Sequence, residues 1–290
     1  MNVAHDPAEL PPGERAVAVG SFDGVHRGHR RVLEAAIGAG LPATVVTFWP
    51  HPRLVLGNRV ELLSTLQRRL ELFEAAGIPE TLVLEFTVEL AQLEPRDFAE
   101  AILRRIGARV IVVGEDFRFG HAASGDAALL AELGFDVRPV PLVKGVSSTR
   151  IRQLVAAGDV QSAAALLGRP PELEGVVVLG DERGGTLGFP TANLNVPAEL
   201  LVPAYGIYAG AALGHRAAIS VGVNPHYGGA ERRVESYLLD FEGDLYGQRL
   251  VLELWRRLRD EQAFGSEEEL VRQIAADVEQ ARLASRPPAS

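Results

Sequence analysis

Apolar segments and helical periodicities alternate along the first half of the chain. Short apolar segments predict buried strands at residues 16–19, 43–48, 81–86 and 109–113. Between them, apolar residues recur at helical spacing over residues 65–76 and from about residue 95 to residue 106. Because strands that are apolar throughout are typical of sheets buried on both faces, we expect an α/β Rossmann-like domain with a parallel sheet and helices on both faces.

The pattern changes at residues 168–171, where Gly-Arg-Pro-Pro interrupts the helical periodicity. Beyond this break, short apolar runs are separated by glycines, at residues 175–179, 206–212, 216–223, 234–241 and 249–255. This spacing predicts an antiparallel β-barrel or sandwich. Ser266 followed by Glu269 forms a capping box, so a C-terminal helix is expected from Ser266 to about Leu283. We therefore expect two domains, over residues 1–168 and 169–290.

The turn after the first of these strands carries the first candidate chemistry. Gly20 and Gly24 mark the turn, and His26 and His29 share one face of the helix that follows. A helix N-terminus presents free backbone N–H groups, and Gly28 would let a phosphate chain lie close to the backbone. These features indicate a nucleotide triphosphate site, although glycine-rich turns of this kind also occur in α/β proteins without one.

Two later segments have both a structural and a functional interpretation. In the loop at residues 114–120, Phe117 and Phe119 can hold a flat aromatic ligand or fill the core beneath the loop. Further on, a hydroxyl residue can cap a helix, and Arg152, one turn inside that helix, can reach a phosphate. The candidate caps are Ser147, Ser148 and Thr149.

Two features of the second half combine polar side chains with an extended backbone. Thr191 and Asn193 follow a glycine-rich segment and point the same way if the chain is extended. Their hydroxyl and amide oxygens are neutral ligands for Mg²⁺ and phosphate, although turn residues alone also explain this loop. We expect the Glu235 carboxylate on a largely apolar strand face, as a desolvated base or as an isolated charge at a sheet edge. The residues that share this face are Tyr237, Leu239 and Phe241.

Composition narrows the classes of partner. The chain of 290 residues has no cysteine, which excludes disulfides, thiolate metal sites and cysteine nucleophiles. A formal net charge of −9 disfavours binding to nucleic acid. No apolar run approaches the roughly 20 residues that span a membrane, and the first residues show no secretory signal. We therefore expect a cytoplasmic protein with small-molecule partners and no nucleic-acid or membrane contact.

Several motifs follow one another in both halves. These are Gly20-Ser-Phe-Asp-Gly-Val-His-Arg-Gly-His29, Ser147-Ser-Thr-Arg-Ile-Arg152, Leu187-Gly-Phe-Pro-Thr-Ala-Asn193, Asp244-Leu-Tyr-Gly247, Arg259-Asp-Glu261 and Phe264. In this order they resemble the bifunctional riboflavin kinase and FAD synthetase family of prokaryotes. The first resembles its nucleotidyltransferase signature and the second its further phosphate motif. The third is similar to its kinase signature and is the most specific match. The resemblance extends from about Ala16 to Ala281.

The resemblance implies two ATP-dependent reactions. The C-terminal barrel would phosphorylate riboflavin to FMN. The N-terminal nucleotidyltransferase domain would join FMN to AMP, giving FAD and pyrophosphate. The expected partners are therefore riboflavin, FMN, FAD, ATP, ADP and pyrophosphate, with Mg²⁺ as cofactor and ATP as co-substrate.

The resemblance also implies roles for individual residues. Glu235 would be the kinase base, with Thr191 and Asn193 binding Mg²⁺ and the ATP phosphates. His26 and His29 would stabilise charge on the ATP phosphates during adenylyl transfer. Other residues expected to bind ATP or its phosphates are Gly20, Phe22, Gly28, Ser148, Thr149 and Arg152. The expected flavin-binding residues of that domain are Asp116 and Phe119.

The chain departs from the family pattern at a few positions. Ala122 and Ala123 stand where a basic residue is common. Gly185 replaces an arginine, Pro171 a tyrosine and His226 a threonine. None of these is a proposed catalytic residue, so we expect altered affinity, most of all near His226. Two other hypotheses stay open: a flavin-binding homologue that retains only one activity, and a nucleotidyltransferase acting on RNA, which the acidic net charge disfavours.

Overall fold

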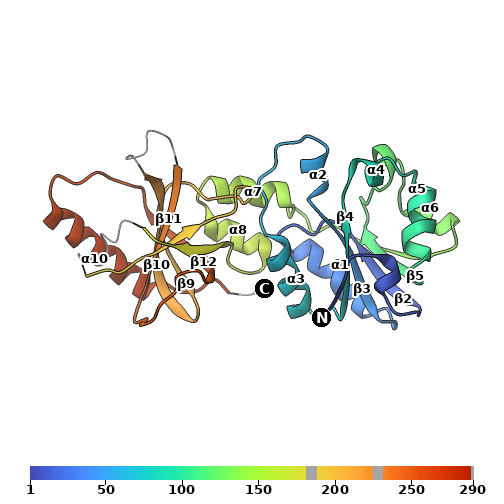
Figure 1. Ribbon diagram of the computed structural model, residues 1–290, viewed down its shortest axis with the longest axis horizontal. Helices are drawn as coiled ribbons and strands as arrows, with labels where there is room; N and C mark the ends of the chain where they lie inside the picture. The colour runs from blue at the N-terminus through green and yellow to red at the C-terminus, as the bar shows by residue number, and fades with distance from the viewer. Residues whose placement is uncertain (181–187, 225–230, 289–290) are drawn as a thin grey trace. The chain divides into compact units, whose positions relative to one another are not determined.

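The structure, a computed structural model, describes residues 1–180, 188–224 and 231–288 (Figure 1). Contacts within the chain divide it into two compact units. The first comprises Met1–Val60 and Ser64–Ser147, and the second comprises Glu61–Leu63 and Ser148–Ser290. Each unit has its own sheet and its own core.

The first unit contains a six-stranded sheet with the strand order β1-β4-β3-β2-β5-β6. All neighbouring strands run parallel, which confirms the expected sheet. The strands are β1 (Asn2–Ala4), β2 (Arg15–Val19), β3 (Ala43–Trp49), β4 (Glu80–Glu85), β5 (Ala108–Gly114) and β6 (Asp136–Val140). The strand order reverses between β2 and β5, and in such sheets a ligand crevice forms at the carboxyl ends of the strands where this happens.

Helices and apolar clusters cover both faces of this sheet, as the apolar strands β2, β3, β4 and β5 predict. Ala16 and Leu33 lie in one buried cluster, whereas the neighbouring Val17 lies with Leu103 in the other. Figure 1 shows α1 and α3 on one side of the strands and α5 and α6 on the other. The longer elements are α1 (Arg27–Ile37), α3 (Leu66–Ala75), α5 (Pro95–Phe98), which continues as a π-helix over Ala99–Arg104, and α6 (Ala127–Glu132). The shorter ones are α2 (Pro52–Val55), α4 (Val88–Ala91) and the 3₁₀ turns Pro7–Glu9 and His121–Ala123.

The second unit contains a closed barrel with the strand order β10-β11-β8-β7-β12-β9. Its strand pairs are antiparallel, as both the expected barrel and the sandwich require, and the closure of the sheet confirms the barrel. The strands are β7 (Glu172–Val178), β8 (Ala192–Asn195), β9 (Gly206–Ala212), β10 (His215–Asn224), β11 (Glu231–Leu238) and β12 (Arg249–Arg259). Apolar side chains such as Leu173, Val221 and Leu252 fill the interior of the barrel.

The C-terminal helix α10 (Glu267–Leu283) begins where the capping box predicts. The hydroxyl of Ser266 accepts a hydrogen bond from the backbone N–H of Glu269 at 3.2 Å. The Glu269 carboxylate in turn accepts one from the backbone N–H of Gly265 at 2.9 Å, rather than from that of Ser266. Ser266 therefore caps one free N–H group of the first turn, and Glu269 ties the helix to the backbone just before it.

The contacts place α7 (Ser148–Ala156) and α8 (Val160–Leu167) in the second unit, although the apolar pattern changes only after residue 168. Val160 belongs to the barrel core, with 1% of its surface exposed. A Cβ atom at Gly158 would lie 3.0 Å from the Tyr208 hydroxyl, so a glycine lets this turn approach the barrel wall closely. Helical periodicity does not say which sheet a helix covers, which explains why pattern and contacts divide the chain at different residues.

Candidate functional site

The loop after β2 carries the histidine pair at the start of α1. His26 is the N-cap of α1, and its Nδ1 accepts a hydrogen bond from the backbone N–H of His29 at 3.2 Å. Because Nδ1 accepts, the ring proton of neutral His26 lies on Nε2. The two imidazole rings stack, and Phe22 contacts His29 edge-on at 5.3 Å between ring centroids. Sequence reasoning expected a shared helix face, and the structure places the rings against each other.

The backbone of this loop is held in an uncommon conformation. Phe22 and Val25 have φ angles of 50° and 40°, and Gly24 has 79°. Non-glycine residues in this left-handed region each cost about 1–3 kcal/mol, and such strain persists where the surroundings fix it. Phe22 and Val25 are both buried, with exposed fractions of 4% and 1%. The loop is therefore held by packing as well as by hydrogen bonds.

A buried polar group that sequence reasoning missed fixes the same loop. The Asp23 carboxylate accepts hydrogen bonds from the backbone N–H and the hydroxyl of Ser64, at 3.1 and 3.2 Å. The Ser64 hydroxyl accepts one from the backbone N–H of Gly24 at 3.2 Å. Beneath them, the fully buried guanidinium of Arg69 lies 3.7 Å from Asp23. The chain separation of 41 residues between Asp23 and Ser64 left no local signal for this contact.

The structure gives a reason for glycine at position 28 that differs from the close approach of a phosphate inferred from the sequence. A Cβ atom at this position would lie 3.2 Å from Cε1 and 3.3 Å from Nδ1 of His26. Gly28 therefore leaves room for the ring that caps the helix. Similarly, a Cβ at Gly20 would lie 3.2 Å from the ring of Phe22. Direct contact of either glycine with a phosphate remains a prediction.

A cavity of about 370 Å³ in the barrel and one of about 730 Å³ in the first unit are lined by several of the other candidates. The larger one is lined mainly by aromatic and apolar side chains, and Gly20 is among its lining residues. Phe119 lines it and is also part of the core, with Phe117 stacked on it at 5.5 Å. The interpretation as a core residue therefore holds for Phe119, and contact of its ring with a flat ligand stays a prediction. Asp116 is exposed and is not among the lining residues.

This cavity also contains residues that were not predicted as candidates, namely Phe48, Phe86, Phe98, Arg118 and His121. The His121 Nδ1 lies 3.3 Å from the Glu94 carboxylate. Ala122 and Ala123, where the family often has a basic residue, line the same cavity and have φ angles of 53° and 57°. Positive charge at this cavity therefore comes from Arg118 and, when protonated, from His121.

The predicted phosphate residues on α7 belong to the second unit, whereas the histidines belong to the first. Ser148 and Thr149 form the first turn of α7. The Nε of Arg152 donates a hydrogen bond to the backbone carbonyl of Glu61 at 2.8 Å, within the same unit. Their joint action with His26 and His29 stays a prediction.

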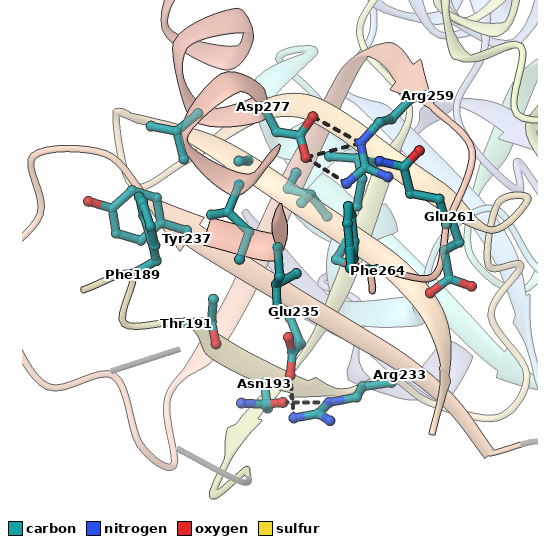
Figure 2. Close-up of a pocket in the computed structure, with 18 residues that line it drawn as sticks. Phe189, Thr191, Asn193, Arg233, Glu235, Tyr237, Arg259, Glu261, Phe264 and Asp277 are labelled. Carbon is teal, nitrogen blue, oxygen red and sulfur yellow. Dashed lines mark hydrogen bonds and ion pairs between the residues drawn. The ribbon is translucent and has the colours of Figure 1, made fainter. Parts of the chain in front are cut away.

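In the barrel, the structure brings Thr191, Asn193 and Glu235 to one cavity (Figure 2). Asn193 of β8 and Glu235 of β11 are direct partners across the two strands. Thr191 directly precedes β8 and also lines a second cavity of about 340 Å³. Asp244 and Tyr246, from the motif at residues 244–247, also line that cavity. Thr191 thus stands where the two cavities meet.

The environment of Glu235 corrects the expectation of an apolar face. Arg233, two residues earlier on the same face of β11, forms an ion pair with the Glu235 carboxylate. Its Nε also donates a hydrogen bond to Oδ1 of Asn193 at 3.2 Å, as Figure 2 shows. The side chain of Glu235 is 24% exposed, and β11 ends at Leu238, so neither Leu239 nor Phe241 extends its strand face. The sequence argument considered only the residues after Glu235 and therefore missed the arginine before it.

The oxygen donors at this site suit Mg²⁺. Mg²⁺ is usually held by one or two protein oxygens together with substrate phosphates and waters. Thr191 and Asn193 offer such oxygens, and Glu235 adds a carboxylate nearby. In the described parts of the chain, no group of three or more His, Asp or Glu side chains could hold a metal by itself. The donor set therefore fits a cation that arrives with phosphates.

The opposite wall of the barrel cavity is fixed by a buried ion pair. Asp277 of α10, only 3% exposed, accepts hydrogen bonds from Nε and Nη2 of Arg259 at 3.0 and 2.7 Å. The guanidinium of Arg259 lies 5.8 Å from the ring centre of Phe264, which lines the cavity. Burial raises the pKa of the neighbouring Glu261 carboxyl, and the Arg259 charge opposes that shift. Ile219, Leu270 and Ile274 add apolar surface.

Comparison with known proteins decides the family. The FAD synthetase family model matches residues 10–152, and the riboflavin kinase model matches residues 167–284. The chain belongs to the bifunctional riboflavin kinase/FMN adenylyltransferase family. The member from Escherichia coli K12 is 34% identical over 94% of this chain and 93% of its own length. The member from Bacillus subtilis is 32% identical, over 97% and 96% respectively.

One solved structure has a similar fold over nearly the whole length of this chain. A crystal structure from Streptococcus pneumoniae, described as a macrolide-efflux protein, is 32% identical with a TM-score of 0.87, and the match covers 98% of this chain and 99% of that one. In the present structure, none of the helices described is long and apolar enough to cross a membrane. Gly185 and His226, two of the departures from the family pattern, lie outside the described residues.

Proposed function

We propose that this chain makes FAD from riboflavin in two ATP-dependent steps, with a riboflavin kinase in the barrel and an FMN adenylyltransferase in the α/β unit. Both family models match this one chain, the FAD synthetase model at residues 10–152 and the riboflavin kinase model at residues 167–284. The observation that carries the assignment of residues is the position of Thr191, where the two cavities of the barrel meet beside Asn193 and Glu235. We assign the FMN adenylyltransferase activity to residues 1–168 and the riboflavin kinase activity to residues 169–290.

In the kinase step, riboflavin occupies the cavity with the apolar wall and the ATP phosphates extend from the cavity beyond Thr191. Glu235 takes the proton from the ribityl 5′-hydroxyl as the oxygen of that hydroxyl attacks the γ-phosphorus of ATP. The bond from that phosphorus to the β–γ bridging oxygen breaks, which gives FMN and ADP. Thr191 and Asn193 would hold Mg²⁺, which neutralises charge on the phosphates.

In the second step, an oxygen of the FMN phosphate attacks the α-phosphorus of ATP. The bond from the α-phosphorus to the α–β bridging oxygen breaks, which gives FAD and pyrophosphate. His26 donates from Nε2 to the phosphate oxygens, and His29 lies beside it to stabilise the same charge. The aromatic cavity lined by Phe119 holds the flavin ring, with Asp116 at its entrance.

The remaining assignments complete the nucleotide site. The backbone at Gly20, Phe22 and Gly28 borders the phosphates, because these residues shape the loop and the start of α1. Ser148, Thr149 and Arg152 bind phosphate oxygens during adenylyl transfer. Both steps consume ATP, so we place the enzyme in the cytoplasm.

A time course of flavin products tests this proposal. The purified chain is incubated with riboflavin, ATP and Mg²⁺, and flavins are separated by chromatography while pyrophosphate is measured. We expect FMN first and FAD later, with one pyrophosphate released per FAD. FMN that accumulates without FAD would contradict the adenylyltransferase assignment and leave a homologue with one activity. Unchanged riboflavin, with supplied FMN also unconverted, would contradict both assignments.

A further inference from the structure

Arg233 places its positively charged guanidinium between Asn193 and Glu235. In the proposed function, Asn193 binds the metal and Glu235 acts as the base. The guanidinium bonds to the Asn193 amide oxygen through Nε and pairs with the Glu235 carboxylate through Nη2. Figure 2 shows the guanidinium directly beside both side chains. The oxygen of Asn193 that would bind Mg²⁺ is therefore already engaged by a positive charge of the protein itself.

The position of Arg233 on β11 directs its side chain into the barrel cavity. Arg233 and Glu235 lie two residues apart on β11 and therefore point to the same side, into the barrel cavity. Arg232, the neighbouring arginine, pairs instead with Glu61 at 3.0 Å and does not line the cavity. The two adjacent arginines thus carry the same charge, but only one of them faces the kinase site.

A divalent cation that arrives alone meets an unfavourable site. To bind Asn193 it must take the amide oxygen from Arg233, and it then lies beside an arginine that still carries its charge. Like charges at such short range repel strongly in a partly desolvated cavity. A metal ion without phosphates offers the guanidinium no new partner.

A cation that arrives with a nucleotide meets a different site. Phosphate oxygens are strong acceptors for the planar fork of a guanidinium, often through two parallel hydrogen bonds. Arg233 can therefore turn from Asn193 and Glu235 to a phosphate, which frees the amide oxygen for the metal and the carboxylate for the substrate hydroxyl. The positive charge stays in the site and is used there for phosphate binding.

We infer that Arg233 makes binding of a divalent cation at the kinase site conditional on a nucleotide. It holds Asn193 and Glu235 together in the empty site and is drawn away by the phosphates of the nucleotide. This inference rests on the proposed function of the barrel. By linkage, metal and nucleotide must strengthen each other's binding, and Arg233 supplies part of that coupling.

Binding of Mn²⁺, as a spectroscopic substitute for Mg²⁺, tests the inference without any reaction. Free Mn²⁺ is titrated by electron paramagnetic resonance against the full chain, with and without ADP. Arg233→Met is expected to bind Mn²⁺ alone about tenfold more tightly than the wild type, and ADP is expected to strengthen its Mn²⁺ binding correspondingly less. Arg232→Met, which removes the same charge one residue away, should match the wild type.

Further variants assign the effect to this site. Arg233→Met combined with Asn193→Leu should lose the additional Mn²⁺ affinity, because the freed amide oxygen is gone. Sites in the first unit are common to all the variants and cancel in the comparison. Conversion of FMN to FAD and circular dichroism show that each variant is folded. Should Arg233→Met fail to fold, Arg233→Lys replaces it, since an ammonium lacks the fork that bridges both groups, and about threefold tighter Mn²⁺ binding is expected.

Two results would overturn the inference. The first is a folded Arg233 variant that binds Mn²⁺ alone no more tightly than the wild type. The second is an equal gain in Arg232→Met, which would show that net charge and not position matters. Formation of FMN by the wild type is assayed separately, so an absent kinase activity would contradict the proposed function while the Mn²⁺ result still decides the role of Arg233.

Discussion

The imidazole rings of His26 and His29 lie face to face, with 3.5 Å between their centroids and 16° between their planes. His26 also closes the first turn of α1, because its Nδ1 accepts the backbone N–H of His29. One side chain therefore does two things, since it caps a helix with one nitrogen and presents an N–H with the other. The two contributions can be separated by substitution.

Replacing His26 with asparagine should keep the helix cap and remove the phosphate donor. Asn is among the best N-cap residues, whereas Ala at such a position costs about 1 kcal/mol. We expect both His26→Asn and His26→Ala to slow the conversion of FMN to FAD by about 10²-fold, the usual effect of losing one charge-stabilising donor. Only His26→Ala should also lower the free energy of unfolding measured in urea. An Asn variant that makes FAD at the wild-type rate would show that His26 acts only as a cap.

Gly180→Ala should damage the kinase site without touching the other one. A Cβ atom at Gly180 would lie 2.2 Å from the amide nitrogen of Asn193, so the Asn193 side chain must move. A displacement of about 1 Å at a reacting group commonly costs about 10²-fold in rate. We expect riboflavin phosphorylation to fall by that factor and to require more Mg²⁺, while FAD formation from supplied FMN is unchanged. Unaltered FMN formation would contradict the role given to Asn193.

The stability of the first unit should depend on pH through the carboxyl group of Glu80. Burial by itself would raise the pKa of Glu80, but hydrogen bonds from Arg15 and Thr44 and the Arg15 charge outweigh it and lower the pKa below its ordinary value of 4.5. A lowered pKa in the folded state contributes stability that is complete above the ordinary value and is lost as the pH falls through the lowered one. Wild-type stability should therefore decline on acidification below about pH 4.5.

Glu80→Gln is the matching variant. It leaves the Arg15 guanidinium, 4% exposed, without its carboxylate, so we expect a loss of about 3 kcal/mol near neutral pH. Because the variant has no carboxyl to protonate there, its stability should fall less on acidification, and the two curves should converge. Urea unfolding of both proteins from about pH 3 to pH 7 measures this. Parallel curves would contradict the assignment.

Asp277→Asn should weaken riboflavin binding by releasing one wall of the barrel cavity. Asp277 holds Arg259, and Arg259 packs against Phe264 of the barrel cavity. We expect about 3 kcal/mol lower stability of the barrel, typical of a broken buried pair, and a higher KM for riboflavin with a smaller change in kcat. Arg282→Met on the same helix removes a more exposed ion pair with Asp240 and should change neither the stability of the barrel nor the KM for riboflavin noticeably. An Asp277→Asn enzyme with an unchanged KM would limit the pair to a structural role.

The apolar pattern predicts the strands that contain a clear apolar run, in the barrel as well as in the parallel sheet, and misses the shortest and the most exposed ones. β2, β3, β4 and β5 occur close to where the apolar runs predict them. β1 has only three residues, and β6 is mostly exposed, so neither produces a clear apolar run. β8 has only four residues, two of them polar, and the apolar pattern did not predict it.

Motifs located the candidate residues but not the partners that hold them. Asp23 and Ser64 are far apart in sequence, as are Arg259 and Asp277, and each pair forms only once the strands and helices are packed. Arg233 differs, because its place two residues before Glu235 was visible in the sequence. Strand alternation applies in both directions from a residue, and applying it toward the N-terminus would have found this arginine.

The central claim is that one chain carries two independent sites, one for each step. The most direct measurement compares Glu235→Gln and His29→Ala, each supplied with riboflavin or with FMN in the presence of ATP and Mg²⁺, followed by chromatography of the flavins. We predict opposite outcomes: Glu235→Gln leaves riboflavin unconverted but turns FMN into FAD, whereas His29→Ala turns riboflavin into FMN and stops there. Loss of both products in either folded variant, or full FAD formation by His29→Ala, would contradict the claim of two independent sites.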